Sequence, residues 1–224
     1  MLKEVIRYDV IEILTILKGQ EMKKTIVIFA NSIKHQKHCV AGKCILTKQW
    51  VRPVSNIQGR ELTSQQTTYV NKYGTYLVKP KQKIEMNFNS HAPILHQPEN
   101  YLIDNSPWQQ RYKIEDSEVN QYLDAPTSLW GTTNKVEYSR INSKMIVIPQ
   151  SLYLIQTKGL TLYKTKEDKR RASFNYNSIA YDFPVTDPNF DKIRTEGMNT
   201  FGILCISLGE NFNGYCYKIV ATIF

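Results

Sequence analysis

Three residues early in the chain place positive charge and an aromatic ring close together in sequence. Lys43 precedes a tight turn, and Trp50 and Arg52 follow it in a short extended segment. Side chains alternate along a strand, so Trp50 and Arg52 point to the same side. A guanidinium can contact a phosphate or a base edge, and an indole can stack on a base, so we expect these residues to face an anionic ligand. The alternative is that Trp50 packs against the connection, residues 91–143, and Arg52 pairs with a carboxylate such as Glu99 or Asp104.

A second group of aromatic candidates lies in a predicted hairpin, residues 170–183. With a two-residue turn, Phe174 is opposite Tyr181 and Tyr176 is opposite Ile179, so the rings share one face. Exposed rings of this kind can stack on bases, and each stack contributes about 1 to 3 kcal/mol. The alternative is that this aromatic face is the core of a barrel.

Basic residues precede and begin the same hairpin. Lys169, Arg170 and Arg171 are consecutive, and Glu167 and Asp168 offset part of their charge. Lys and Arg that neutralise phosphates release counterions, which drives association with nucleic acid. We expect the three basic residues to contact phosphate, and a merely solvated loop is the alternative.

Histidine and cysteine residues around position 40 are of the types that bind zinc, but their spacing does not complete a site. His35 and His38 fall in a turn, whereas Cys39 and Cys44 lie on opposite faces of the strand that follows. No second pair completes a tetrahedral set, so no metal ligand is expected.

Candidate catalytic groups are His96, Glu99 and Asp104, with Asp187 and Glu210 as further acids. A hydrolase would need two or three of them to converge on one pocket. The sequence has no P-loop, dinucleotide fingerprint, nucleophile elbow or paired-carboxylate metal motif, and Asp187 is explained as a helix cap. We therefore expect no catalytic residue and no cofactor, with a small metal-dependent nucleic-acid-processing enzyme as the alternative.

The composition favours an anionic partner. The 224 residues include 29 Lys and Arg against 20 Asp and Glu, a formal net charge of +9. This charge does not distinguish DNA, RNA or a nucleotide. The four cysteines are expected to be reduced, and no apolar stretch approaches the roughly 20 residues that span a bilayer. A cytoplasmic protein without a membrane partner is expected.

The first 21 residues form an N-terminal extension in this interpretation. Apolar residues from Leu2 to Leu17 recur at helical spacing with charges on the other side, which predicts an amphipathic helix. This helix could dock an effector protein, in which case the chain is an adaptor. Alternatively, Met22 is the usual start and the extension is dispensable.

Beyond the extension the pattern is that of short β-strands. Residues 22–90 and 144–224 each give three strands, a helix or loop, and two strands, and the last two strands of the first set are expected at 75–78 and 82–88. That order is typical of the five-stranded OB barrel, which binds oligonucleotides. Residues 91–143 are expected to be a packed, irregular or helical connection. The predicted fold class is mainly β, with two tandem OB-like barrels, short helices and the N-terminal amphipathic helix.

Several short segments also form a recognisable set. They are FANS at 29–32, HCVAGK at 38–43, WVRPVS at 50–55, HQPEN at 96–100, VTDP at 185–188, SLGE at 207–210 and GYCYK at 214–218. Together they resemble the dual OB-containing domain family of bacteria, over about residues 25–224. The resemblance implies two OB barrels and a role in binding or sensing nucleic acid, often in defence against mobile elements. It implies no catalytic residue.

Overall fold

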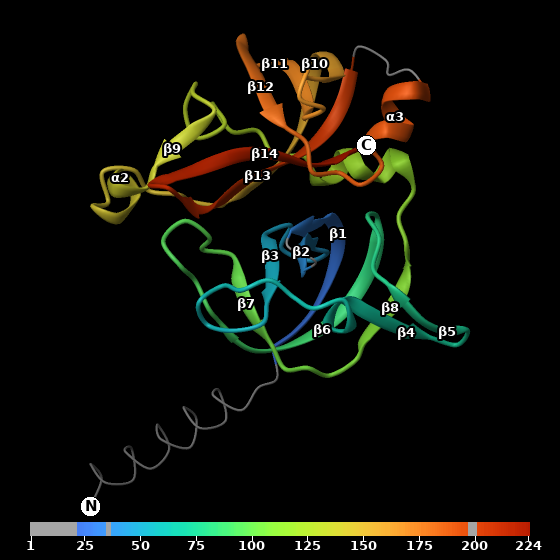
Figure 1. Cartoon of the computed structure of the whole chain (residues 1–224). Coiled ribbons are helices and arrows are strands. Elements are labelled where there is room, and N and C mark those ends of the chain that lie inside the picture. The colour runs from blue at the N-terminus through green and yellow to red at the C-terminus, as the bar shows by residue number, and fades with distance from the viewer. Residues whose placement is uncertain (1–21, 35–36, 197–200) are drawn as a thin grey trace, which may run out of the picture.

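The computed structural model describes residues 22–34, 37–196 and 201–224. They consist mainly of two curved β-sheets that follow each other along the chain and lie one against the other (Figure 1). The amphipathic helix predicted for residues 1–21, and the effector docking assigned to it, lie outside the described residues. Within the described ranges, no helix is long and apolar enough to cross a membrane.

The first sheet has eight strands, five of which close into a barrel. The strands are β1 (Met22–Lys34), β2 (Lys37–Cys44), β3 (Trp50–Val54), β4 (Thr68–Asn71), β5 (Gly74–Leu77), β6 (Gln82–His91), β7 (Asn100–Ile103) and β8 (Trp108–Lys113), with a short 3-10 helix, η1 (Gln65–Thr67), before β4. The barrel order is β1-β2-β3-β7-β6, and β6 closes it by pairing with β1. Strands β3 and β7 run parallel, while the other barrel pairs are antiparallel. This is a closed barrel of the OB type.

The last barrel strand differs from the expectation. Strand β7 lies in the segment 91–143 that was predicted to be an irregular connection, and it pairs with both β3 and β6. The segment 75–78, predicted to be a barrel strand, instead overlaps β5, which pairs with β4 in a hairpin outside the barrel. All four residues of β5 are exposed. The parallel pairing of β7 joins residues far apart in sequence, so local alternation gives no sign of it.

The second sheet is a half-barrel. Its strands are β9 (Lys135–Glu137), β10 (Leu152–Lys164), β11 (Arg170–Tyr176), β12 (Ile179–Pro184), β13 (Phe201–Phe212) and β14 (Tyr215–Ile223), in the order β12-β11-β10-β13-β14-β9. Helix α3 (Phe190–Glu196) lies between β12 and β13. From β10 onward the chain therefore follows the predicted order of three strands, a helix and two strands.

The half-barrel departs from the second closed barrel that was predicted. In the part of the chain that the structure describes, a single β-bridge, the isolated parallel one between Val185 and Val220, joins the β12 side of the sheet to β14. Strand β12 ends at Pro184, which has no amide hydrogen to extend a ladder, and this is the physical reason for the open seam. Residues 145–148, which precede β10, form neither a strand nor a helix.

The segment between the sheets folds into short helices. The 3-10 helix η2 (Asp116–Tyr122) begins with a reciprocal capping box between Glu115 and Glu118, and α2 (Tyr138–Asn142) follows β9. Val119 and Tyr122 of η2 are buried. Both side chains belong to the apolar cluster that lies between the two sheets.

Strand β1 is apolar along its middle because both of its faces are buried. Ile26 and Ile28 point into the closed barrel, whereas Val27 and Phe29 point outwards to the second sheet. The buried apolar residues on this outer side form what we call the inter-sheet layer: Val27, Phe29, Ala30, Ala41, Trp50, Ile114, Val119, Tyr122, Leu152, Leu154, Cys205 and Ala221. The two sheets thus share one apolar layer besides their separate interiors.

Asp124 adds charge and hydrogen bonds to this layer. Its Oδ1 accepts from the Lys43 ammonium at 2.6 Å, and its Oδ2 accepts from Trp50 Nε1 at 3.0 Å and from the Leu154 amide at 2.8 Å. Lys43 also donates to the Tyr122 carbonyl at 2.7 Å. Burial lowers the pKa of the Lys43 ammonium, and the Asp124 carboxylate opposes that shift. The buried charge of Lys43 is therefore balanced mainly by one carboxylate.

Replacing that carboxylate should destabilise the protein strongly. We expect Asp124→Asn to lower the free energy of unfolding in urea by about 3 to 5 kcal/mol, because it leaves the Lys43 charge buried without compensation. The matched control is Asp116→Asn, which breaks an ion pair between Lys81 and a carboxylate that is 86% exposed. The control should cost at most about 1 kcal/mol. Equal losses in the two variants would contradict the role given to Asp124.

A second ammonium is buried inside the half-barrel. Lys218 on β14 has no exposed surface, and it donates to the carbonyls of Gly131, at 2.9 Å, and Thr133. Burial lowers the pKa of Lys218 to about 8. These bonds hold the loop before β9 against β14.

This burial predicts a pH dependence of stability. The pKa of Lys218 is about 8 in the folded protein and returns to 10.5 on unfolding, so the unfolded state binds more protons between these values. Stability from this group therefore rises as pH increases through that window. We expect Lys218→Met to flatten that rise when the free energy of unfolding is measured across the window, and an unchanged slope would contradict the assignment.

Candidate nucleic-acid interface

The outer face of β2 and β3 is covered by the second sheet. Lys43, Trp50 and Arg52 share this face, as expected, but their exposed fractions are only 3%, 4% and 8%. The Lys43 ammonium lies 5.2 Å from the centre of the Trp50 ring, and both side chains bond Asp124. The expectation that these residues face a ligand is therefore corrected, because the face on which they lie is turned into the inter-sheet layer.

Arg52 joins the two sheets through its own set of contacts. Its Nη2 donates to Ser151 Oγ at 2.8 Å, and its Nε lies 3.4 Å from Glu99 Oε1. The Ser151 amide donates to Glu99 Oε2 at 3.1 Å, and the Ser151 hydroxyl donates to Oε1. The alternative, in which Arg52 pairs with Glu99, is what the structure contains.

The candidate acid–base residues do not converge on an open pocket. His96 and Glu99 are 8% and 6% exposed, and burial, with the nearby Arg52 charge as a second cause, lowers the pKa of His96. Asp104 accepts from the amide and hydroxyl of Ser106 at 2.9 and 2.7 Å. Among the described residues, no group of three or more His, Cys, Asp or Glu side chains is placed to hold a metal ion.

The predicted hairpin register is confirmed, with β11 and β12 pairing Phe174 to Tyr181 and Tyr176 to Ile179. Its aromatic face, however, points into the half-barrel. Phe174 and Tyr181 are each 2% exposed, with ring centres 5.8 Å apart, and the half-buried Tyr176 donates its hydroxyl to the Pro126 carbonyl at 2.8 Å. The core alternative therefore holds, and the structure corrects the stacking role suggested for these rings.

The opposite face of the hairpin is turned away from the closed barrel. Strands β11 and β12 lie on the far side of the half-barrel (Figure 1). Because Ala172 and Phe174 point inwards, the residues between them point outwards. The register places the following residues together on what we call the outer face of β10–β12: Lys158, Thr161, Tyr163, Arg171, Ser173, Asn175, Ala180 and Asp182.

Asp182 orders the planar groups of this outer face. It accepts from Arg171 Nε at its Oδ1, at 2.6 Å, and its backbone carbonyl accepts from Arg171 Nη2 at 2.8 Å. The Tyr163 hydroxyl donates to Oδ2 of the same carboxylate, and this bond raises the pKa of Tyr163. A guanidinium and a phenol are thus held by one carboxylate, on a face that also carries the small residues Ser173 and Ala180. Such an arrangement can offer flat surfaces and donors to a base or phosphate.

The basic loop adjoins this face, but most of its charges are paired. Lys164 Nζ lies 2.9 Å from Asp168 and 3.2 Å from Asp191, and Arg170 Nη2 lies 2.7 Å from Asp191. Arg170 thereby braces helix α3. Of the three predicted phosphate contacts, Lys169 is exposed, Arg170 is bonded to α3, and Arg171 lies on the outer face.

The sequence was compared with models of known protein families, and one family matches almost the whole chain. The family model of the dual OB-containing domain matches residues 24–223 of the sequence. The chain belongs to the dual OB-containing domain family. The resemblance drawn from the short segments is confirmed, and the family fold fits the closed barrel followed by a half-barrel. A search of curated proteins returned no match.

Solved structures with some likeness to this dual OB chain include a murine DNA-binding protein bound with double-stranded DNA. It is 10% identical, with 92% of this chain and 96% of that chain covered and a TM-score of 0.39. Another is the tetrameric p202 HIN2, at 9% identity, with 91% and 92% covered and a TM-score of 0.36. Because these scores are below 0.5, neither likeness supports a statement about function.

Three residues that organise this dual OB structure were missed in the sequence. Asp124 lies in the irregular connection, where no periodicity marks which carboxylate is buried. Tyr163 and Asp182 alternate with core residues on their strands, so a period of two could have placed both on the outer face with Arg171.

The corrected placement of Arg52 can be tested. We expect Arg52→Met to lower the free energy of unfolding by about 3 to 5 kcal/mol, because Glu99 is left buried without its partner. Under conditions where the variant remains folded, its affinity for oligonucleotides at low salt should equal that of the unchanged protein. A large loss of affinity in folded protein would return Arg52 to the binding surface.

Proposed function

We propose that this dual OB protein binds nucleic acid through the outer face of β10–β12 and the loop 165–169. OB barrels bind oligonucleotides on the face of their second and third strands and on adjoining loops. In the half-barrel these strands are β11 and β12, whose outward residues include Arg171. The loop between its first and second strands carries the exposed Lys166 and Lys169.

One observation supports this face over its counterpart in the closed barrel. The equivalent strands there are β2 and β3, and their outer face is buried under the second sheet with Lys43, Trp50 and Arg52. Of these two equivalent faces, only that of the half-barrel is open to a polymer. The formal net charge of +9 favours binding of a negatively charged polymer.

We further propose binding without catalysis, in a sensor or adaptor of a bacterial defence system in the cytoplasm. Family membership supports this role through the defence setting that the resemblance implies. The burial of His96 and Glu99 supports binding over hydrolysis, because neither side chain is open to a substrate. Single-stranded nucleic acid is the proposed form of the ligand, since OB surfaces present planar groups to unstacked bases.

The direct test is filter binding with single- and double-stranded DNA and RNA at low and moderate salt, with and without magnesium. We expect tightest binding to a single strand and a steep loss of affinity as salt increases. Shortening of the oligonucleotide only when magnesium is present would overturn the non-catalytic assignment. An affinity that does not change with salt concentration would contradict the proposal that basic side chains contact the phosphates.

The loop can be tested by charge reversal. We expect Lys166→Glu with Lys169→Glu to weaken binding at low salt and to reduce the slope of log affinity against log salt by about 1 to 2, because each lost phosphate contact removes about 0.7 to 0.9. Arg170 is left intact because it braces α3 through Asp191. The slope is measured by repeating the filter assay across a salt series.

The matched control makes the same change of charge elsewhere. Arg140 and Lys144, in and just after α2, are exposed, and Arg140→Glu with Lys144→Glu should leave the slope unchanged. If the control pair lowers affinity as much as the loop pair, binding depends on net charge alone and the assigned surface is wrong.

A further inference from the structure

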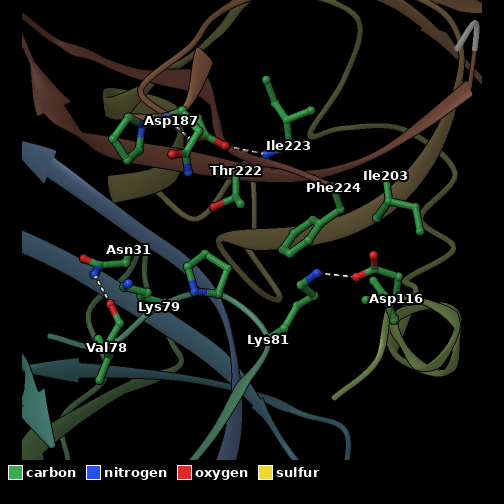
Figure 2. Close-up of a pocket in the computed structure, with 14 residues that line it drawn as sticks. Asn31, Val78, Lys79, Lys81, Asp116, Asp187, Ile203, Thr222, Ile223 and Phe224 are labelled. Carbon is green, nitrogen blue, oxygen red and sulfur yellow. Dashed lines mark hydrogen bonds and ion pairs between the residues drawn. The ribbon is translucent and has the colours of Figure 1, made fainter. Parts of the chain in front are cut away.

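A groove of about 630 Å³ lies between the closed barrel and the half-barrel, away from the outer face of β10–β12. Its lower wall in Figure 2 is the loop before β6, with Lys79 and Lys81, and its upper wall is the end of β14, with Thr222 and Phe224. Small-molecule sites in proteins have volumes of about 300 to 1,000 Å³ and often lie between structural units. The groove therefore has the size and position of a ligand site.

The cationic wall of the groove is held rigidly. The Lys79 amide donates to Gln82 Oε1 at 2.7 Å, and the Lys81 amide donates to the Ile28 carbonyl at 2.8 Å. The Lys81 carbonyl in turn accepts from the Ile114 amide at 2.8 Å. Both lysines therefore extend from a backbone that is already fixed, so little ordering is needed when a ligand binds.

The present partner of Lys81 is easily replaced. Its ammonium pairs with Asp116, at the start of η2, and the Asp116 side chain is 86% exposed. An exposed pair of this kind contributes about 0 to 1 kcal/mol, so a phosphate with more charge can displace the carboxylate. Lys79 is exposed next to it. The Lys81 ammonium can thus be released to a phosphate, and Lys79 adds a second positive charge to the same wall of the groove.

The rest of the lining is mixed and includes several apolar residues and one aromatic ring. The Phe224 ring projects into the groove beside Lys81 in Figure 2 and is fixed by an edge contact with Phe29, with ring centres 5.9 Å apart. Pro80 and Pro188 add flat apolar surface. An aromatic ring next to an ammonium group, on a wall that carries a second lysine, matches a planar base attached to a phosphate.

The buried carboxylate in the groove wall is satisfied by backbone groups. Asp187 is 1% exposed, and its oxygens accept from the Asn189 amide at 2.7 Å and the Ile223 amide at 2.8 Å. Its two oxygens are therefore occupied by the amides before α3 and on β14, and Lys79 and Lys81 lie on the opposite wall of the groove. We propose that this groove binds a nucleotide, with the phosphate at Lys79 and Lys81 and the base against Phe224.

This site is independent of the polymer-binding surface proposed above. The test is calorimetric titration of the full chain with adenosine monophosphate, adenosine, ribose 5-phosphate and inorganic phosphate as probes. We expect saturable binding of one molecule of adenosine monophosphate per chain, and weaker binding of each of the three partial ligands. If inorganic phosphate binds as tightly as adenosine monophosphate, the proposal that the base contributes to affinity is wrong. No saturable heat with adenosine monophosphate would overturn the site.

Three variants locate the site. Lys79→Glu with Lys81→Glu should weaken adenosine monophosphate binding by about tenfold or more, which is about 1.4 kcal/mol. Asp116→Asn frees Lys81 and should tighten binding, an effect in the opposite direction that misfolding cannot imitate. Lys72→Glu, on an exposed lysine in the turn between β4 and β5, should change nothing. Equal weakening by Lys72→Glu, or weaker binding in Asp116→Asn, would overturn the assignment.

The same titrations distinguish a free nucleotide from the end of a strand. A short oligonucleotide with a terminal phosphate is added as competitor, first to the unchanged chain and then to the Lys166→Glu, Lys169→Glu variant. If the oligonucleotide still displaces adenosine monophosphate from the loop variant, the groove binds the terminal nucleotide of a strand. If the oligonucleotide does not displace adenosine monophosphate from either protein, the groove binds free nucleotides. The loop variant should retain adenosine monophosphate binding in full, and loss of that binding would show that the groove is not a separate site.

Discussion

The contact between the Lys43 ammonium and the Asp124 carboxylate fixes how the closed barrel and the half-barrel meet. Removing two charges from water is costly, and the cost is offset only where the geometry is good and the remaining donors are satisfied. Asp124 meets this condition by also accepting from Trp50 Nε1 and from the Leu154 amide. Strands from both sheets supply these donors, so one relative placement of the sheets satisfies all of them together.

That placement gives different roles to the same strands in the two halves. In the closed barrel, the second and third strands become part of the inter-sheet layer, and their cationic and aromatic residues stabilise the fold. In the half-barrel, the outward faces of the second and third strands carry Arg171 and Asp182, and Tyr163 adjoins them from the first strand. The same strand order has thus produced one face that joins the two sheets and one face that is exposed or half-buried.

The sequence predicted what depends on neighbours along the chain. The alternation of Ile84, Met86 and Phe88 marks a strand with one face in the barrel, and the turn at Asn177 and Ser178, with φ of 47° and 63°, fixes the register of the β11–β12 hairpin. The order of elements from β10 to β14 followed from such patterns.

What escaped prediction depends on partners distant in sequence. Alternation shows that Trp50 and Arg52 share a face, but it cannot show whether water or a second sheet lies against that face. For the same reason the pairing of β3 with β7 was missed. Gly42 in the HCVAGK segment has a similar explanation in three dimensions, since a Cβ there would lie 2.2 Å from the Val27 carbonyl oxygen on β1.

The open seam of the half-barrel has a consequence for its motion. Where β12 and β14 meet, the isolated bridge between Val185 and Val220 includes the bond that the Thr186 amide donates to the Val220 carbonyl at 2.9 Å. Regions with few hydrogen bonds open at lower free energy than full ladders. Amide hydrogens along this seam should therefore exchange with solvent sooner than those of β10 and β13, and the half-barrel should breathe along a line that the closed barrel lacks.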